Sequence, residues 1–266
     1  MLTGTVAVSA RDLLLAHGDH VAVRGGGFDL ATGTAVALIG PNGSGKSSVL
    51  DAVAGLLAVR SGSLRVLPDA GAEARIAYVL QSTEVPEHLP MTVREVVTMG
   101  RYARAGLVGR IGAVGRRAID AAMERVEVTD LADRQLLELS GGQRQRALVA
   151  QGLAAEADLL LMDEPMTGLD LVSAERIRRV IDDERAAGRT VVFSTHDLHE
   201  ARGADTVVLL AGRVVACGPP DEVLVEGHLL DAYRGRVLGT GDGLTVLDDP
   251  HHHGDVRDRH DGHDHG

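Results

Sequence analysis

The stretch GPNGSGKS at residues 40–47 constrains this chain more than any other, because it has the spacing of a phosphate-binding loop. Two glycines enclose four residues, and a lysine and a serine follow directly. Residues 35–39 before it form a short apolar run with β-branched members, and apolar residues recur at helical spacing over residues 48–54. The loop is therefore predicted to join a strand to a helix.

In that setting, glycines let backbone N–H groups approach a polyphosphate, and the helix N-terminus adds partial positive charge. Lys46 is predicted to reach the β- and γ-phosphates, and Ser47 to hold Mg²⁺. Lys46 is also the only lysine in the chain. A compact ammonium fits between two phosphate oxygens, whereas a guanidinium is wider and favours a forked partner. The predicted nucleotide-binding residues here are Gly40, Pro41, Asn42, Gly43, Ser44, Gly45, Lys46, Ser47 and Ser48.

Length, charge and cysteine content limit the class of protein. The 266 residues suffice for one large domain or two small ones. No apolar run approaches the ~18 residues that cross a bilayer, so we expect a soluble, cytoplasmic chain. Cys217 is the only cysteine, which excludes an intrachain disulfide and a cysteine zinc cluster. The net charge of −11 argues against nucleic-acid binding.

Strand patterns dominate the first part of the chain on both sides of the phosphate-binding loop. Residues 1–30 alternate in short apolar runs between glycine-rich turns, which predicts antiparallel strands. Residues 60–63 are expected to form a turn before strand-like runs at residues 64–66 and 76–80. The second run ends at Gln81, where a glutamine can face a metal-bound phosphate.

Residues 90–157 have mainly helical patterns, which indicates an all-α insertion in an α/β chain. Thr92 and Glu95 have the spacing of a capping box, and residues 117–126 form a further amphipathic run. A glycine-interrupted basic cluster lies within this region. Two interpretations stay open for it, a solvated loop surface and a docking site for an acidic partner. Its members are Arg101, Arg104, Arg110, Arg116 and Arg117.

The stretch LSGGQ at residues 139–143 leads into another helical run. A serine and two glycines at a helix start leave N–H groups free and favour an anion through the helix dipole. A second anion-binding helix terminus is therefore predicted at Ser140.

An apolar strand ending in two carboxylates follows at residues 159–164, the Walker B pattern. One carboxylate can hold Mg²⁺ through water, and its neighbour can polarise an attacking water. We assign Asp163 to the first role and Glu164 to the second. A further buried strand at residues 190–195 ends at His196, for which we predict a functional role.

The C-terminal part has two more strands within residues 205–217 and helix-compatible stretches within residues 221–233. The globular fold is expected to end near Leu247. Residues 248–266 then carry six of the twelve histidines among aspartates and glycines, a composition that can ligate metals but cannot form a core. The spacing matches no fixed zinc geometry, and an inert solvated tail or an expression remnant stays open.

With these motifs together, the chain resembles the nucleotide-binding subunit of ABC transporters over nearly all of residues 3–235. The LSGGQ signature beside both Walker motifs is highly specific. The resemblance implies an α/β fold with a P-loop NTPase (RecA-like) core, an antiparallel β subdomain and a helical subdomain. The expected divisions are an ATPase domain at 1–235, with its core and β subdomain at 3–88 and 156–235 and its helical subdomain at 89–155, an extension at 236–247 and a tail at 248–266.

The same resemblance assigns roles to single residues. Two subunits would pack head to tail, so that the signature of one faces ATP held by the other's Lys46. Gln81 would link nucleotide to the membrane subunit, Asp170 would be the D-loop acid, and His196 would contact the γ-phosphate. His17 stands where the family usually stacks an aromatic on adenine. The signature residues expected to bind nucleotide are Ser140, Gly141, Gly142 and Gln143.

Two stretches resemble those in the ATPase subunits of zinc or manganese importers, and less closely those of iron-siderophore importers. They are TVREVVTMGRY at residues 92–102 and EPMTGLD at 164–170. We therefore expect a Mg²⁺-dependent ATPase that drives import of a metal ion, zinc first, through a membrane permease fed by an extracytoplasmic binding protein. The alternatives are an iron-siderophore or haem importer, an exporter, a non-transport ABC ATPase and a metal-buffering protein.

Overall fold

The fold is built on a six-stranded sheet with the order β10-β9-β4-β8-β7-β6. The computed structural model describes residues 5–67, 75–81, 90–102, 110–233, 237–240 and 243–246. Five strands are parallel and β10 adds an antiparallel edge. The strands are β4 (Ala35–Ile39), β6 (Ile76–Val79), β7 (Leu159–Met162), β8 (Thr190–Thr195), β9 (Thr206–Leu210) and β10 (Val214–Gly218).

Strand β4 shows why this sheet lies in the interior. All five of its residues are buried, and they alternate between two hydrophobic cores. Ala37 packs in the core shared with most of the helices, whereas Val36 and Leu38 pack toward the antiparallel sheet. A parallel strand covered on both faces needs this continuous apolar run. The prediction of an α/β core is confirmed.

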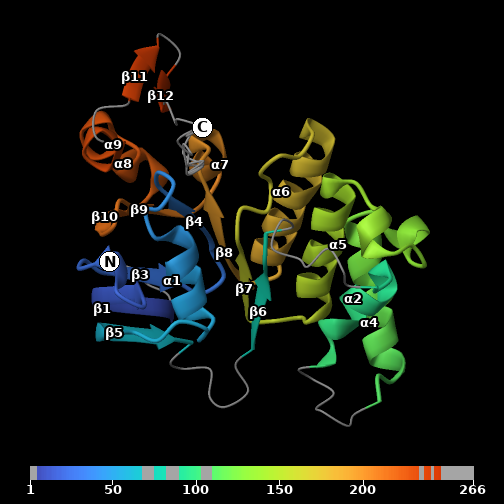
Figure 1. Cartoon of the computed structure of the whole chain (residues 1–266). Helices are drawn as coiled ribbons and strands as arrows, with labels where there is room; N and C mark the ends of the chain where they lie inside the picture. Colours follow the sequence, from blue (N-terminus) through green and yellow to red (C-terminus); the bar gives the residue numbers. More distant parts are fainter. Residues whose placement is uncertain are drawn as a thin grey trace, which may run out of the picture.

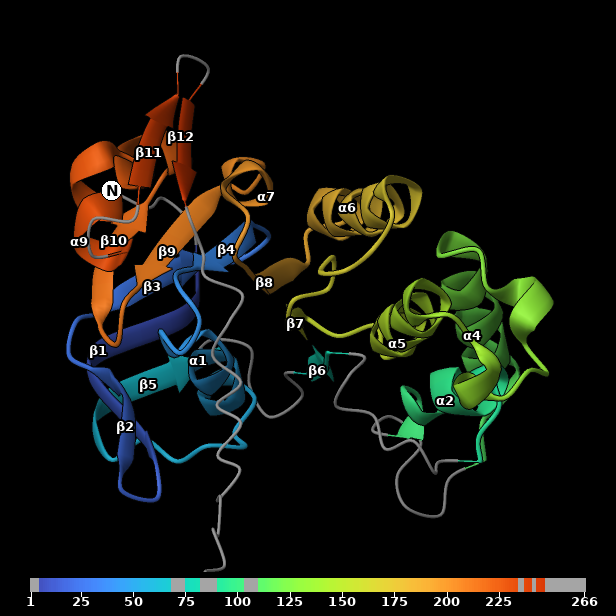
Figure 2. The same ribbon diagram turned by 45° about the horizontal axis from the view of Figure 1, so that its top comes forward.

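A four-stranded antiparallel sheet covers the second core, with α1 (Lys46–Val53) packed beside it (Figures 1 and 2). It consists of β1 (Val6–His17), β2 (His20–Arg24), β3 (Phe28–Ala31) and β5 (Ser61–Val66). The turn expected at residues 60–63 is wrong, because Ser61 to Ser63 pair with β1. Gly62 adopts φ 86° opposite a register shift in β1, so the turn-like residues serve a bulge.

Helices lie on the other face of the large sheet, toward β8, β7 and β6, as Figures 1 and 2 show. The capping box of Thr92 and Glu95 is confirmed at the first of them. They are α2 (Val93–Met99), α4 (Ala113–Arg125), the 3-10 turns η3 (Thr129–Leu131) and η4 (Leu136–Glu138), α5 (Gly141–Ala154) and α6 (Leu171–Ala186). The chain then continues through α7 (Leu198–Arg202), α8 (Pro220–Val223), α9 (Glu226–Tyr233) and the hairpin of β11 (Val237–Thr240) and β12 (Gly243–Val246).

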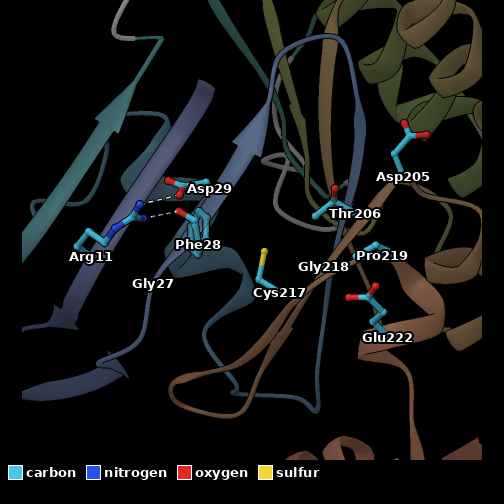
Figure 3. A pocket seen from close by; sticks show the side chains of 10 residues that line it. All are labelled: Arg11, Gly27, Phe28, Asp29, Asp205, Thr206, Cys217, Gly218, Pro219 and Glu222. Atoms are coloured by element: carbon cyan, nitrogen blue, oxygen red, sulfur yellow. Dashed lines mark hydrogen bonds and ion pairs between the residues drawn. The ribbon is translucent and has the colours of Figure 1, made fainter. Parts of the chain in front are cut away.

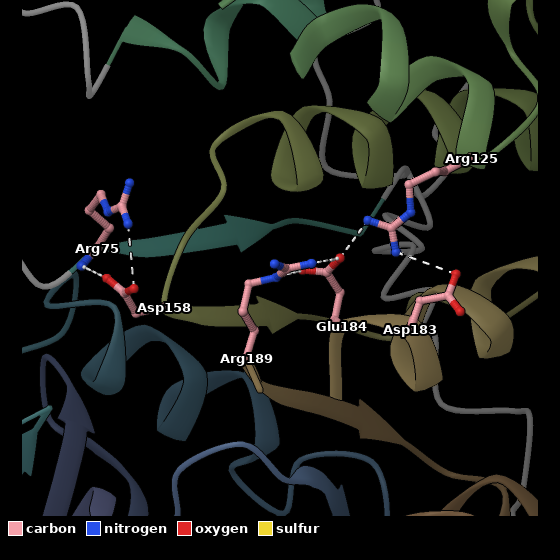
Figure 4. A network of polar contacts seen from close by, with 6 residues as sticks. All are labelled: Arg75, Arg125, Asp158, Asp183, Glu184 and Arg189. Carbon is pink, nitrogen blue, oxygen red and sulfur yellow. Dashed lines mark hydrogen bonds and ion pairs between the residues drawn. The ribbon is translucent and has the colours of Figure 1, made fainter. Parts of the chain in front are cut away.

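A buried carboxylate joins the helices to the large sheet (Figure 4). Glu184 on α6 accepts hydrogen bonds from Arg125 of α4 at 2.5 Å and from Arg189, just before β8, at 2.7 Å. Burial alone would raise the pKa of Glu184, but the bonds from Arg189 and Arg125 outweigh it and lower this pKa. The ionised carboxylate therefore fixes α4 against the start of β8.

The predicted basic cluster is not one surface. Arg101 is buried and donates to the carbonyl oxygen of Ala154 and to Glu156, so neither open interpretation holds for it. Its guanidinium instead binds the C-terminal end of α5. Arg104 and the tail at residues 248–266 lie outside the described residues.

Candidate functional site

The phosphate-binding loop joins β4 to α1, as the sequence predicts. Gly45 stands at the N-cap of α1 with φ 98°, a left-handed conformation that favours glycine. A Cβ at Gly45 would clash with the side chain of Val23 and lie 2.9 Å from the carbonyl oxygen of Ala22. The antiparallel sheet therefore packs directly against this loop, which only glycine allows.

The polar groups of the loop suit a polyphosphate. The Lys46 ammonium is buried and donates to the carbonyl oxygens of Gly40 at 2.9 Å and Pro41 at 3.3 Å. The Ser44 hydroxyl is buried and has no hydrogen-bond partner in the described part of the chain. A cation and an unpaired hydroxyl at a helix N-terminus form a site that fits an anion.

A pocket of about 240 Å³ opens over this loop. His17 lies at its edge, where its Nε2 is 3.0 Å from the Ser48 hydroxyl. The lining residues are His17, His20, Ala22, Asn42, Gly43, Ser44, Gly45, Lys46, Ser47, Ser48 and Glu164. His17, Glu164 and the predicted loop residues from Asn42 to Ser48 thus lie around one pocket, whereas Gly40 and Pro41 do not line it. His20, which the sequence analysis did not single out, also lines the pocket.

Two carboxylates stand at the end of β7, beside the ends of β6 and β8. Asp163 is buried, and Glu164 is half-buried with φ 44°. Gln81, after β6, donates from Nε2 to Glu164 Oε2 at 3.4 Å. Parallel strands bind ligands at their carboxyl ends, and the expected polar residues of β6 and β7 do gather there.

His196 follows β8 at the same edge and is exposed. The turn that carries it is held from both sides. Thr195 donates from its hydroxyl to Glu200 and accepts from the backbone N–H of Asp197 at 3.0 Å. Burial raises the pKa of Glu200. His196 makes no hydrogen bond to the carboxylates among the described contacts.

The signature stretch begins α5. Ser140 caps the helix, accepting from the Gln143 backbone at 3.3 Å while its own N–H donates to the Gln143 side chain at 3.0 Å. The pKa of Asp170 is lowered by hydrogen bonds from the backbone and the hydroxyl of Ser173. A pocket of about 400 Å³ is lined by Ser140, Gly142, Gln143, Arg146, Gly168, Leu169, Asp170, Ser173 and Arg176.

The two pockets share no lining residue. One has the phosphate loop and Glu164, and the other has the signature and Asp170. Sequence reasoning missed Arg146 and Arg176, which line the second pocket. The Arg146 guanidinium donates to the carbonyl oxygens of Val126 and Glu127, both at 2.9 Å, so its charge is largely committed to the fold. The sequence signal that could have revealed Arg146 was a charged residue on the apolar face of a helix.

A larger pocket lies away from both sites. Figure 3 shows it between β1 and β3 on one side and β9, β10 and α8 on the other, with a volume of about 720 Å³. The Arg11 and Asp29 side chains pair at 2.6 Å on its wall. It has neither a phosphate loop nor clustered catalytic groups, and we assign no role to it.

Comparison with known proteins identifies the family. The sequence model of the ABC transporter family matches residues 23–167. The zinc transport system ATP-binding protein TroB of Treponema pallidum is 38% identical, over 88% of this chain and 89% of its own. The manganese transport system ATP-binding protein MntB of Listeria innocua is 35% identical, over 85% and 95%. A probable metal transport system ATP-binding protein of Chlamydia pneumoniae is 40% identical, over 77% and 81%.

Solved structures agree on the fold. A chain from an inward-facing ABC transporter described as of metal-chelate type superposes with a TM-score of 0.78 at 26% identity, covering 91% of this chain and 98% of that one. A dimeric ATP-binding cassette, MJ0796, gives 0.70 at 23%, covering 80% and 98%.

This chain therefore belongs to the ABC transporter family, as one of its ATP-binding subunits. It is an ATPase, and its substrate is ATP. No described helix is long and apolar enough to span a membrane.

Proposed function

We propose that this ATPase drives import of a transition-metal ion, zinc or manganese, through a separate membrane permease. The observation that carries the proposal is the relatives' names, which specify zinc, manganese or metal transport at 35% to 40% identity over at least 77% of the chain. Zinc remains the first choice. Because the zinc and manganese relatives are about equally similar, 38% and 35%, the test includes both metals.

In the proposed site, the loop from Gly40 to Ser48 binds the triphosphate, with the Lys46 ammonium moving from its carbonyl partners to phosphate oxygens. Ser47 and Asp163 would hold Mg²⁺, with Gln81 beside them. An Mg²⁺ ion held by these residues would neutralise negative charge on the phosphate. Oxygen donors suit this ion.

Glu164 is proposed to take a proton from the attacking water, and His196 to contact the γ-phosphate. The position of Glu164 in the pocket over the phosphate loop supports its role. His17 would stack on the base. Its ring lies at the pocket edge beside Ser48, which supports that contact.

The proposed working unit is a head-to-tail homodimer. Ser140, Gly141, Gly142 and Gln143 of one copy would bind the triphosphate held by the other, with Asp170 at the interface. The separation of the two pockets on one chain supports this arrangement. Such a dimer would act at the cytoplasmic face of the membrane, where ATP is present, with an extracytoplasmic metal-binding protein delivering the ion to the permease.

The proposed division of the chain places the ATPase domain at residues 1–235, its helical subdomain at 89–155, an extension at 236–247 and a tail at 248–266. The helices α2, α4 and α5, which lie within residues 89–155, support the helical subdomain. The histidines of the tail are proposed to bind zinc loosely. Within the described residues, no three histidine, cysteine, aspartate or glutamate side chains gather to hold a metal ion.

The test is reconstitution with the permease encoded nearest to this chain. The two should co-purify, and cells with both should accumulate labelled zinc or manganese in proportion to ATP hydrolysis. Glu164→Gln is the control, because it should assemble with the permease without supporting uptake. Uptake of iron-siderophore complexes alone, or no assembly with any permease, would contradict the proposal.

A further inference from the structure

One hydroxyl group is hydrogen-bonded to both acidic residues of the site, to the carboxylate of Asp163 and to the backbone of Glu164. Ser194 is the fifth residue of β8 and is fully buried. Met162 of β7 pairs in register with Phe193 of β8, so Asp163 and Ser194 are neighbours where the two strands end. The sequence contained a signal for this residue, because Ser194 is polar within a largely apolar strand. The pattern predicted the strand, but no role was assigned to Ser194.

The Ser194 hydroxyl makes two hydrogen bonds of opposite direction. It donates to Asp163 Oδ1, and it accepts from the backbone N–H of Glu164 at 2.8 Å. Because the N–H of Glu164 can only donate, the single proton of the hydroxyl is used in the bond to Asp163. The pattern therefore uses one carboxylate oxygen of Asp163 and leaves Oδ2 to other ligands.

The hydrogen bond from the Glu164 N–H to Ser194 stabilises an unusual backbone conformation. Glu164 has φ 44°, which side-chain-bearing residues rarely adopt. Its N–H is fixed by Ser194, and its carboxylate accepts from Gln81 at 3.4 Å and lines the pocket over the phosphate loop. The direction of the Glu164 side chain thus depends on a turn that Ser194 anchors.

We propose that Ser194 is a positioning residue for ATP hydrolysis, which orients the Mg²⁺-binding carboxylate of Asp163 and fixes the turn that aims Glu164. This rests on the roles proposed above for Asp163 and Glu164. Ser194 touches neither nucleotide nor metal in this scheme, and acts only through these two residues.

A purely structural role would give a different result, and Thr190 supplies the matched control. Thr190 is at the other end of β8, about 13 Å away at 3.3 Å per residue, and is equally buried. Its hydroxyl also accepts from a backbone N–H, that of Gly33, at 3.0 Å. Thr190→Val therefore removes a similar bond from the same strand, outside the site.

The experiment measures binding of the non-hydrolysable analogue AMP-PNP by calorimetry, with Mg²⁺ and with EDTA, for the full chain. In Ser194→Ala, we expect binding in EDTA to be unchanged and the gain in affinity from Mg²⁺ to shrink by about 10- to 100-fold, or to vanish where that gain is smaller. Turnover at saturating Mg²⁺ and ATP should fall as well. Thermal unfolding of each variant accompanies the titrations.

Ser194→Cys keeps the shape and a weak donor, and is expected to give an intermediate loss; it replaces the alanine variant if that one does not fold. An unchanged Mg²⁺ effect and turnover in Ser194→Ala, or losses equal to those of Thr190→Val, would overturn the proposal. Failure of the underlying roles would look different, because then Asp163→Asn would keep the Mg²⁺ effect or Glu164→Gln would keep wild-type turnover.

Discussion

The two helix termini that are predicted to bind phosphate differ in what surrounds their glycines. At the phosphate loop, a Cβ on Gly45 would strike the chain's own antiparallel sheet. At the signature, the nearest atom to a Cβ on Gly142 would be the Ser173 hydroxyl at 3.5 Å, an ordinary contact. The fold of one chain therefore requires Gly45 but not Gly142. The absence of a clash at Gly142 within one chain is consistent with a site that a second chain completes.

The same contrast holds for the reactive groups. The phosphate-loop pocket includes Glu164, and the signature pocket includes Asp170, whose carboxylate already accepts two bonds from Ser173. In the proposed assignment, the residues around the phosphate loop would carry out the chemistry and those around the signature would bind the nucleotide. Substitutions in the two pockets should therefore have different effects on ATP hydrolysis and on ATP binding.

The largest effect is expected from Glu164→Gln on the chemical half. The amide keeps the shape of the side chain but cannot take a proton, so turnover should fall by about 10²–10⁴ with ATP affinity retained. Steady-state hydrolysis and equilibrium binding of ATP measure the two quantities. Near-normal turnover would remove Glu164 from its proposed role.

Gly142→Ala tests the binding half. The added methyl fits the single chain, so stability and ATP affinity should stay near wild type. Hydrolysis should fall by about 10²-fold, because a displacement of about 1 Å at a reacting group has this cost. Gly227→Ala on α9, where no atom lies within 4 Å of the added carbon, is the control.

Mixing sharpens this test. A chain with Lys46→Ala has an intact signature, and one with Gly142→Ala has an intact phosphate loop. Each alone should hydrolyse ATP far more slowly than wild type, whereas their mixture should regain hydrolysis in dimers that contain one intact composite site. Two chains that stay inactive when mixed, despite forming dimers, would contradict the shared site.

The next effect concerns the joint between the helices and the sheet. Glu184→Gln replaces a buried carboxylate that binds two arginines, and should cost about 2 kcal/mol of unfolding free energy. Because the pKa of Glu184 is lowered on folding, its contribution is present above the ordinary value of 4.5 and is lost as pH falls through the folded-state value. The difference between wild type and variant should therefore shrink below pH 4.5, as followed by urea unfolding.

The smallest effect is expected for substitutions of His17, the residue proposed to stack on the adenine base of ATP. A tyrosine at position 17 offers a larger stacking surface than imidazole but loses the contact with Ser48. His17→Tyr should tighten ATP binding by about fivefold, since aromatic stacking contributes about 1 kcal/mol. His17→Ala should weaken it. Weaker binding by the tyrosine variant would place the base elsewhere.

Local patterns were enough to predict the strands that meet at the site and the caps of α2 and α5, because each depends on residues within a few positions. The residues missed depend on neighbours distant in the chain. Ser194 matters through Asp163, 31 positions away, and Arg146 through Val126 and Glu127. The turn expected at residues 60–63 failed for the same reason, since the long strand β1 pairs with that segment.

The single lysine also makes the chain a simple target for amine chemistry. A reagent that acylates ε-amines can modify one side chain only, and Lys46 is 6% exposed with its ammonium held by two carbonyl oxygens. The N-terminal α-amine can react as well, so only an acyl group located on Lys46 reports an event at the phosphate loop. The mass of the peptide that contains Lys46, followed over time, would show how often that loop opens and how far ATP shields it.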